Sequence, residues 1–246
     1  MSPSPAAPSP AAPSPAPATG PWPLSQAFTT FWRFPSPRIL ATFLVVVLAI
    51  RLWLGAWSPW HALIPVVLVA VHPFTEWLIH VFLLHWRPRK VLGLTLDTVA
   101  ARDHRAHHKD PPYLPLIFIP LPTLFSGAAL VTAAWLLLSP DLPFALSGLL
   151  STTVIALAYE WTHYACHVPW APKSWWWRSR IKHHRLHHYK NERYWYGVSL
   201  HLGDRVLGTL PEADQVPRSP TARDLEARGP ASVPYTHLTL PTSDLV

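Results

Sequence analysis

Histidine is concentrated in four short stretches of this sequence, which hold eleven of its fifteen histidines. Neutral imidazole is the commonest metal ligand in proteins, so clustered histidines indicate a metal site. One stretch has the spacing H-x4-H, one has H-x3-H, and two share H-x2-HH. In chain order the clustered residues are His80 and His85; His104, His107 and His108; His163 and His167; and His183, His184, His187 and His188.

The spacings place most of these rings on common helix faces. Residues i and i+3 or i+4 lie on one face of an α-helix, because a turn takes about 3.6 residues. Each H-x2-HH stretch, and the pair of His163 and His167, can therefore point its rings into one volume. His80 and His85 lie five residues apart, which requires a frayed or distorted helix end.

Ten of these imidazoles, all but that of His183, are expected to converge from four elements. They cannot all be charged near neutral pH, because like charges at short range repel. Neutral imidazoles that share divalent metal ions remove this conflict. Ten ligands exceed what one metal ion uses, so we predict two metal ions. The isolated residues His61, His72 and His237 are interpreted as ordinary surface or core histidines.

Four apolar stretches must position the histidines, at residues 39–57, 61–85, 114–138 and 142–159. Each is close to the roughly 20 residues that a helix needs to cross a bilayer. The very short connections between the first and second stretches and between the third and fourth predict two helical hairpins. We expect Arg51 to snorkel to the membrane surface. Pro115, Pro120 and Pro122 predict a bent or re-entrant start to the third stretch.

Half of the residues are apolar and 14 are tryptophan, which excludes an ordinary soluble domain. Lysine and arginine gather in residues 87–109 and 173–193, which the positive-inside rule places in the cytoplasm with both termini. All four histidine clusters then lie at that same end. The net charge of +7 is explained by membrane topology, so no nucleic-acid partner is expected. The single cysteine, Cys166, gives no indication of an oxidising compartment.

The order H-x4-H, H-x2-HH, H-x3-H, H-x2-HH resembles the fatty acid hydroxylase superfamily of membrane di-metal oxygenases, most closely its fatty acid 2-hydroxylases. The resemblance covers about residues 60–210 and includes "TEWLIHVFLLH", "DHRAHHKDP", "YEWTHYACH", "HHRLHHYKNERYWYGVS" and "GDRVLGT". It implies an all-α membrane protein with four transmembrane helices in two hairpins and a cytosolic helical cap that holds a histidine-rich di-metal centre. The ligands it implies are His80, His85, His104, His107, His108, His163, His167, His184, His187 and His188.

The resemblance also implies a reaction and its cofactors. Cleavage of an unactivated C–H bond needs a redox-active metal that activates O2, which zinc cannot do. We therefore expect two iron ions, which zinc can replace in purified or crystallised protein, with O2 as co-substrate. Electrons would come from a separate ferredoxin or cytochrome b5-type donor and its reductase. The expected reaction is hydroxylation of the fatty acyl chain of a membrane lipid, near its carboxyl end, in lipid biosynthesis.

Two carboxylates stand close before metal-ligand candidates. Glu76 precedes His80 by four residues and Glu160 precedes His163 by three, so both are candidates to orient ligand rings through hydrogen bonds. The alternative is that each pairs with an arginine or a backbone group at the membrane interface. His201 lies where the family has a bulkier, tryptophan-containing stretch, and it is not counted as a ligand.

Other functions remain open at this point. A carotenoid or sterol hydroxylase or desaturase of the same superfamily is the first alternative, although the H-x3-H spacing at His163 favours the fatty acyl branch. A histidine-rich metal transporter is the non-enzyme alternative. Such a transporter needs polar groups mid-membrane to pass an ion, and only His72 and Glu76 are candidates here.

The ends of the chain are expected to lie outside the membrane domain. The composition of residues 1–20, which is rich in proline, alanine and serine, predicts a disordered arm. Residues 21–210 form the predicted hydroxylase-like membrane domain, and residues 211–246 are expected to be a disordered tail. Its end, "YTHLTLPTSDLV", resembles a translated sequencing-adapter artefact.

Overall fold

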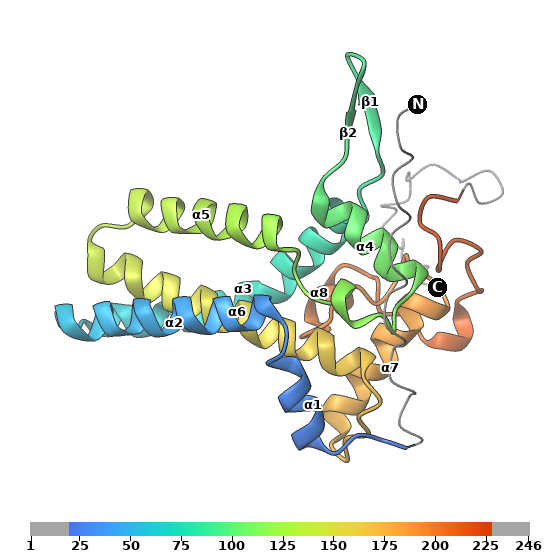
Figure 1. The fold of residues 1–246 in the computed structure, drawn as a ribbon, viewed down its shortest axis with the longest axis horizontal. Coiled ribbons are helices and arrows are strands. Elements are labelled where there is room, and N and C mark those ends of the chain that lie inside the picture. Colours follow the sequence, from blue (N-terminus) through green and yellow to red (C-terminus); the bar gives the residue numbers. More distant parts are fainter. Residues whose placement is uncertain (1–19, 228–246) are drawn as a thin grey trace, which may run out of the picture.

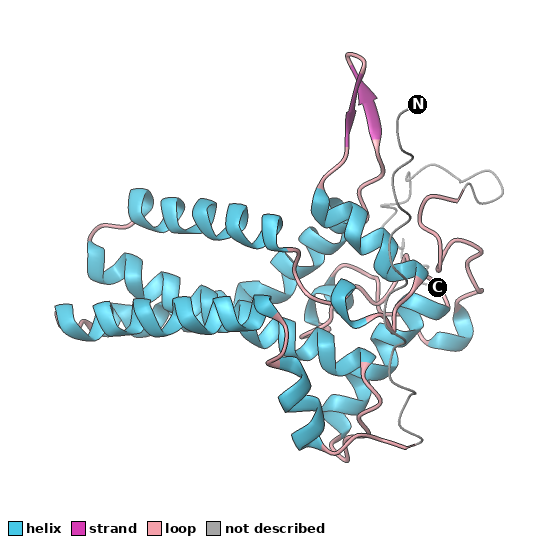
Figure 2. Ribbon diagram, viewed as in Figure 1, coloured by secondary structure: helices cyan, strands magenta, loops and turns pink. Residues whose placement is uncertain are grey.

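The computed structural model describes residues 20–227. Residues 1–19 of the expected arm and the artefact-like end of the chain, which includes His237, lie outside the described residues. Helices dominate the described part (Figure 2). In chain order they are α1 (Leu24–Phe31), α2 (Pro35–Leu54), α3 (Pro59–Leu78), the π-helix η1 (Ile79–Leu84), α4 (Val99–Lys109), the 3-10 turn η2 (Leu114–Leu116), α5 (Leu121–Leu138), α6 (Leu142–His167), α7 (Trp175–Tyr189), α8 (Leu202–Val206) and η3 (Ala213–Gln215).

Four helical segments are long and apolar enough to cross a membrane: Pro35–Leu54, Pro59–Leu84, Leu114–Leu138 and Leu142–His167. They confirm the four expected spans of an all-α membrane fold. The fourth span continues beyond the apolar stretch, so that its last turn carries His163 and His167. In the described residues, strands form only one short antiparallel hairpin, β1 (Arg89–Val91) with β2 (Leu94–Leu96).

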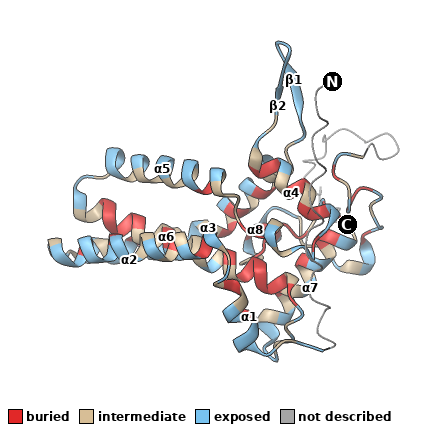
Figure 3. Cartoon of the chain, in the orientation of Figure 1, coloured by how far each residue is buried: buried red, intermediate tan, exposed pale blue. Residues whose placement is uncertain are grey.

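The spans lie side by side, and the remaining elements gather at one end of them as a cap, residues 85–113 and 168–227 (Figure 1). Helix α6 is the central span, because α2, α3 and α5 all pack against it. Gly148 of α6 leaves room for the indole of Trp135, whose ring a Cβ at this position would meet. Burial is concentrated in the cap and along α6, whereas the outer faces of the spans are exposed, as lipid-facing surfaces are (Figure 3).

Arg51 corrects one expectation. It does not snorkel but is fully buried between α2 and α6, where its Nε donates to Ser147 Oγ at 2.9 Å. Its guanidinium also lies 2.9 Å from His61 Nδ1 and stacks 3.8 Å from the centre of the Trp57 ring. A buried guanidinium is tolerated only where its donors find acceptors, and the turn between α2 and α3 supplies the carbonyl of Gly55 as well. The side chain therefore braces the far end of the bundle.

The prolines before α5 interrupt the third span as expected. Residues Leu114–Leu116 form a 3-10 turn, and α5 begins only after Pro120, which has extended backbone angles. Because the helix is interrupted here, backbone groups of Ile117 and Ile119 can bond side chains of α6, which are those of His163 and Glu160.

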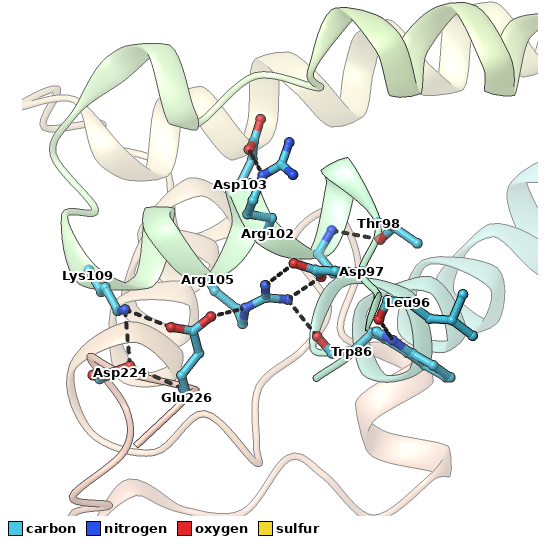
Figure 4. A network of polar contacts seen from close by, with 11 residues as sticks. Trp86, Leu96, Asp97, Thr98, Arg102, Asp103, Arg105, Lys109, Asp224 and Glu226 are labelled. Atoms are coloured by element: carbon cyan, nitrogen blue, oxygen red, sulfur yellow. Dashed lines mark hydrogen bonds and ion pairs between the residues drawn. The ribbon is translucent and has the colours of Figure 1, made fainter. Parts of the chain in front are cut away.

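Residues 211–227 contradict the expected disordered tail. They fold back over α4 and α7, with Val216, Ala222 and Leu225 buried. Glu226 accepts from Arg105 Nε at 2.9 Å and from Lys109 Nζ at 3.1 Å (Figure 4). The prediction failed because the local composition is polar and proline-containing, while the partners of this segment lie outside it, in α4 more than a hundred residues away and at the end of α7 more than twenty residues away.

Candidate metal centre

Four elements bring the ten predicted histidines together. These are the end of the second span, α4, the end of α6, and α7. Their side-chain nitrogens form two sets, within each of which one ligand atom per residue lies within 4.8 Å of all the others. The η1 group is His80, His85, His104, His108 and His187. The α6 group is His107, His163, His167, His184 and His188.

The two H-x2-HH stretches are shared between the groups. Helix α4 contributes its i, i+4 pair, His104 and His108, to the η1 group and His107 to the α6 group. Helix α7 does the reverse, because His184 and His188 join the α6 group and His187 joins the η1 group. The expectation that each stretch points its rings into one volume is therefore corrected: the two cap helices each bridge two neighbouring ligand sets.

The five-residue spacing of His80 and His85 is accommodated by the π-helix. The backbone N–H of His85 donates to the carbonyl of His80 at 3.1 Å, an i to i+5 bond. A π-turn places residues five apart above one another, as an α-helix does with residues four apart. The distorted helix end that the spacing predicted is thus present, and its form is a π-helix from Ile79 to Leu84.

The separations between ring nitrogens suit a coordination sphere. His80 Nε2 lies 3.2 Å from His104 Nε2 in the η1 group. In the α6 group, His184 Nε2 lies 2.7 Å from His167 Nε2 and 3.0 Å from His188 Nε2. Imidazole nitrogens about 2.1 Å from a metal are about 3 Å apart when they occupy adjacent octahedral positions. Both groups therefore have the size that a metal ion needs.

Orphaned buried nitrogens support the same conclusion. A buried polar atom without a partner is costly, so a set of them indicates a missing ligand or ion. Seven of the ten histidines have one such ring nitrogen within the described residues, which is Nε2 in His85, His108, His163 and His187 and Nδ1 in His107, His184 and His188. Of the ten, only His108, His163 and His187 combine an orphaned Nε2 with a ring held by a backbone hydrogen bond.

The histidines of the cap are held neutral. Burial, and then the neighbouring imidazoles, lowers the pKa of His104, His107 and His184 well below the usual range. Burial likewise lowers the pKa of His108 to about 3. A metal ligand must offer an unprotonated nitrogen, so this environment prepares the rings to bind a cation without first losing a proton.

Backbone carbonyls fix the orientation of several rings. His80 Nδ1 donates to Tyr196 O at 2.6 Å, His187 Nδ1 to Tyr194 O at 2.8 Å, and His108 Nδ1 to Ala222 O at 2.8 Å. In the α6 group, His163 bonds the backbone of Ile117. A carbonyl that accepts from one ring nitrogen sets the tautomer and leaves the other nitrogen to the metal.

Glu76 and Glu160 both bond backbone groups, which is the second of the two alternatives given for them, and act on the histidines only through loops. Glu76 Oε1 accepts from the backbone N–H groups of Val198 at 2.7 Å and Ser199 at 2.9 Å. Glu160 Oε1 accepts from Ile119 N at 2.9 Å and from Ser36 Oγ at 2.5 Å. Each carboxylate thus holds a loop whose nearby carbonyl orients a ring, Tyr196 O for His80 and the Ile117 backbone for His163.

Asp204 is a site residue that sequence reasoning missed. It is fully buried and accepts from Tyr196 N at 2.9 Å, Gly197 N at 2.7 Å and Thr209 Oγ1 at 2.6 Å. It therefore closes the loop that presents the Tyr194 and Tyr196 carbonyls. The stretch "GDRVLGT", which contains Asp204, resembles the family, but its sequence did not show which groups the aspartate would bond.

The remaining histidines of the described residues lie outside the two groups. His183 and His201 pack against each other with ring centres 4.4 Å apart, and neither belongs to a ligand set. His72 Nε2 lies 3.5 Å from Glu76 Oε2. His201 is therefore not part of either ligand group in the described residues. Its neighbour Gly203 has no room for a Cβ, because α8 lies against the Pro73 carbonyl of α3.

Comparisons with known proteins agree with this geometry. A family model described as fatty acid hydroxylase matches residues 65–209. The dihydroceramide fatty acyl 2-hydroxylase FAH2 of Arabidopsis thaliana is 31% identical over 185 residues, which are 74% of each chain. The fatty acid 2-hydroxylase of Rattus norvegicus is 31% identical over 146 residues, 56% of this chain and 37% of that one.

A solved structure has the same fold. It is full-length Scs7p, in which only the hydroxylase domain is visible, and it matches with a TM-score of 0.57 and 26% sequence identity. The match covers 74% of this chain and 66% of that one, so this chain spans slightly less than two thirds of the solved protein.

Proposed function

The chain belongs to the fatty acid hydroxylase family, and from this premise we propose that it hydroxylates a membrane fatty acyl chain near its carboxyl end with two iron ions. The observation that carries the proposal is the pair of five-histidine groups, in which buried ring nitrogens lack partners. The named activities of FAH2 and the rat relative point to the same substrate class.

The ten histidines of the two groups are the proposed iron ligands. When bound, a redox-active metal pair supplies the O2 activation that cleavage of an unactivated C–H bond requires. The protein contributes orientation and exclusion of water. Rings such as those of His107, His184 and His187 are fully buried, so the site is shielded from bulk solvent on the cap side. Backbone carbonyls hold the rings in one tautomer, as described for His80 and His108.

The depth of the site supports attack near the carboxyl end. His80 lies in the last turns of the second span, and His163 and His167 lie in the last turn of the fourth. An acyl lipid keeps its polar head at the level where spans end and its methyl end near the midplane. The carbons that lie closest to the histidine groups are therefore those next to the head.

Membership of a hydroxylase family leaves the metal-transporter alternative without support. A carotenoid or sterol remains the second candidate substrate because of the depth of the histidine groups in the bilayer. Such a molecule also places a polar end at this level of the bilayer.

We infer from the basic residues of the cap that the site and both termini face the cytoplasm.

The reaction is tested by mass spectrometry of hydrolysed fatty acids and pigments from an expressing strain with a working electron donor. We expect new 2-hydroxy acids that disappear in His184→Ala and persist in His201→Ala, because only His184 belongs to a ligand group. Hydroxylated carotenoids without hydroxy acids would assign the protein to the second candidate, and the absence of any oxidised lipid would contradict the proposal.

The electron donor is proposed to be a separate, acidic ferredoxin or cytochrome b5-type protein. Its proposed docking surface is the outer side of α7, where a depression of about 490 Å³ is lined by Arg185, Lys190 and Arg218 around Leu186, Tyr189 and Val216. The inner side of the same helix carries His184, His187 and His188, so only one helix separates this surface from both ligand groups.

The docking surface is tested by charge reversal. Arg185→Glu and Arg218→Glu should lower donor-driven turnover about tenfold at low salt, because complementary charge mainly accelerates encounter. Turnover with a small chemical reductant should be unchanged. Arg178→Glu, an exposed arginine at the start of α7, is the matched control. An equal loss with both reductants would show that these residues act in the site itself.

A further inference from the structure

The β1–β2 hairpin is an exposed apolar element outside the four spans. Val91, Leu94 and Leu96 are 44%, 70% and 48% exposed, and Leu92 at the tip is 98% exposed. The register pairs Val91 with Leu94 and Arg89 with Leu96. Since directly paired residues share a face and alternate residues point the same way, the three apolar side chains lie on one face together with Arg89, whose guanidinium stacks 4.7 Å from the centre of the Trp86 ring. Lys90 and Thr95 lie on the other.

At the tip of the hairpin, Leu92 adopts an unfavourable left-handed backbone conformation. Leu92 and Gly93 form the two-residue turn, with φ of +50° and +81°. Turns of this kind favour asparagine, aspartate or glycine at the first position, because a left-handed backbone is unfavourable for other residues. A leucine here is strained and fully exposed, and strained residues that persist in a structure commonly serve a function.

The hairpin is placed at the membrane surface by its connections. Trp86 lies two residues after the end of the second span, and Arg89, which begins β1, lies five residues after it. The hairpin projects sideways from the cap, across rather than along the direction of the spans (Figure 1). Arg87 and Lys90 add positive charge beside the apolar face and Arg89 adds it at the base of that face, and the hairpin itself carries no acidic residue.

The hairpin is fixed to the helix that carries the histidines. Arg105, which lies between His104 and His107 in α4, donates to Trp86 O at 2.8 Å before β1. It also donates to both carboxylate oxygens of Asp97, at 3.1 and 2.7 Å, after β2 (Figure 4). One buried guanidinium thus clamps both ends of the hairpin to α4.

We propose that this hairpin inserts its apolar face and tip into the anionic lipid leaflet beside the cap, and so sets the height of the histidine groups above the bilayer. Apolar side chains next to basic residues are the pattern of elements that lie in the membrane interface. The Arg105 clamp transmits the position of the hairpin to α4. The proposal does not depend on the metal or on the reaction.

The test measures how deep single residues lie in the bilayer. Cys166 is the only cysteine of the chain and is buried, so Leu92→Cys and Leu94→Cys each add one accessible thiol. Each variant is labelled with an environment-sensitive dye in nanodiscs that contain phosphatidylserine and lipids with a quencher near the headgroup. We expect several-fold stronger quenching at 92 and 94 than at Thr95→Cys on the opposite face or at Gln215→Cys in η3.

Further outcomes decide the proposal. Arg87→Gln together with Lys90→Gln should weaken quenching at 92 in anionic discs and have little effect in zwitterionic ones. Equal quenching at 92, 95 and 215 would overturn the proposal. Energy transfer between labelled chains in detergent, without quenching by lipid, would overturn it in favour of a contact with a second copy.

Discussion

The two histidine groups have the same composition: two histidines from the end of a span, an i, i+4 pair from one of the cap helices α4 and α7, and a single histidine from the other cap helix. They differ in the segments that orient their rings. In the η1 group, His80, His108 and His187 all donate to carbonyls of residues 194–222. In the α6 group, His163 instead bonds the backbone of Ile117, before α5. The same arrangement of ligands is thus supported by two different segments, one near the middle of the sequence and one in its last quarter.

The difference extends to the carboxylates. Glu76 holds the loop that orients a ring of the η1 group, and Glu160 holds the loop that orients a ring of the α6 group. Each group therefore has its own carboxylate and its own loop. Changes far from the histidines should affect one group and leave the other intact, because the supporting loops share no residue.

Loss of a ligand should have the largest effect. Purified from an iron-replete host, the protein is expected to carry about two metal ions per chain, as two-metal sites do. His187→Ala should remove the metal of the η1 group and His107→Ala that of the α6 group, each leaving about one ion. Turnover should be abolished in both, since the chemistry needs the pair. Elemental analysis and iron Mössbauer spectra, with His201→Ala as control, check this. Full metal occupancy in either variant would contradict the ligand assignment.

Removal of residues 221–246 should weaken the η1 group alone. It eliminates the Ala222 carbonyl that orients His108 and the Glu226 carboxylate that pairs with Arg105. Loss of such an outer partner typically lowers metal affinity 10- to 100-fold, so we expect about that loss. The measurement is metal competition with a chelator. The matched deletion of residues 230–246, which lie outside the described residues, should leave metal content and activity unchanged, and a loss with this shorter deletion would show that the end of the chain is used.

Removal of a carboxylate should have the smallest and most selective effect. Glu76→Leu leaves the buried backbone N–H groups of Val198 and Ser199 without their acceptor, and Glu160→Leu does the same to that of Ile119. An unsatisfied buried donor costs about 1–3 kcal/mol. Each variant should lower occupancy of its own group in the Mössbauer spectrum, and each glutamine variant, which keeps an acceptor oxygen, should largely restore it. Identical spectral changes in both leucine variants would refute the separate support of the two groups.

Much of the site could be read from spacing alone. The intervals between histidines singled out the ten residues that the structure brings together, although helical periodicity did not show that each H-x2-HH stretch divides its rings between two groups. The five-residue interval at His80 predicted a distorted helix end, since no regular α-helix aligns residues five apart. The four spans followed from the length of the apolar stretches. All of these are local properties, set by a few neighbouring residues.

The contacts that support the site could not be read in this way. Arg51 was expected at the surface because it lies near the end of its span, but the acceptor Ser147 lies on another helix. For Glu76 and Glu160 the sequence left a histidine ring and a backbone group as alternative partners, and loops from distant parts of the chain supply the backbone donors. Residues 211–227 appeared disordered because their hydrogen-bond partners are in α4 and at the end of α7.

The sequence by itself thus determined which residues gather at one end of four spans and what chemistry they can perform, because composition and periodicity act over one or two helical turns. Only the tertiary structure decided how α4 and α7 divide their histidines between two groups. It also decided that carbonyls of residues 194–222 orient the rings of one group, and that Arg105 ties the β1–β2 hairpin to the same helix. These features arise from hydrogen bonds between segments far apart in the chain, where the partner is chosen by packing.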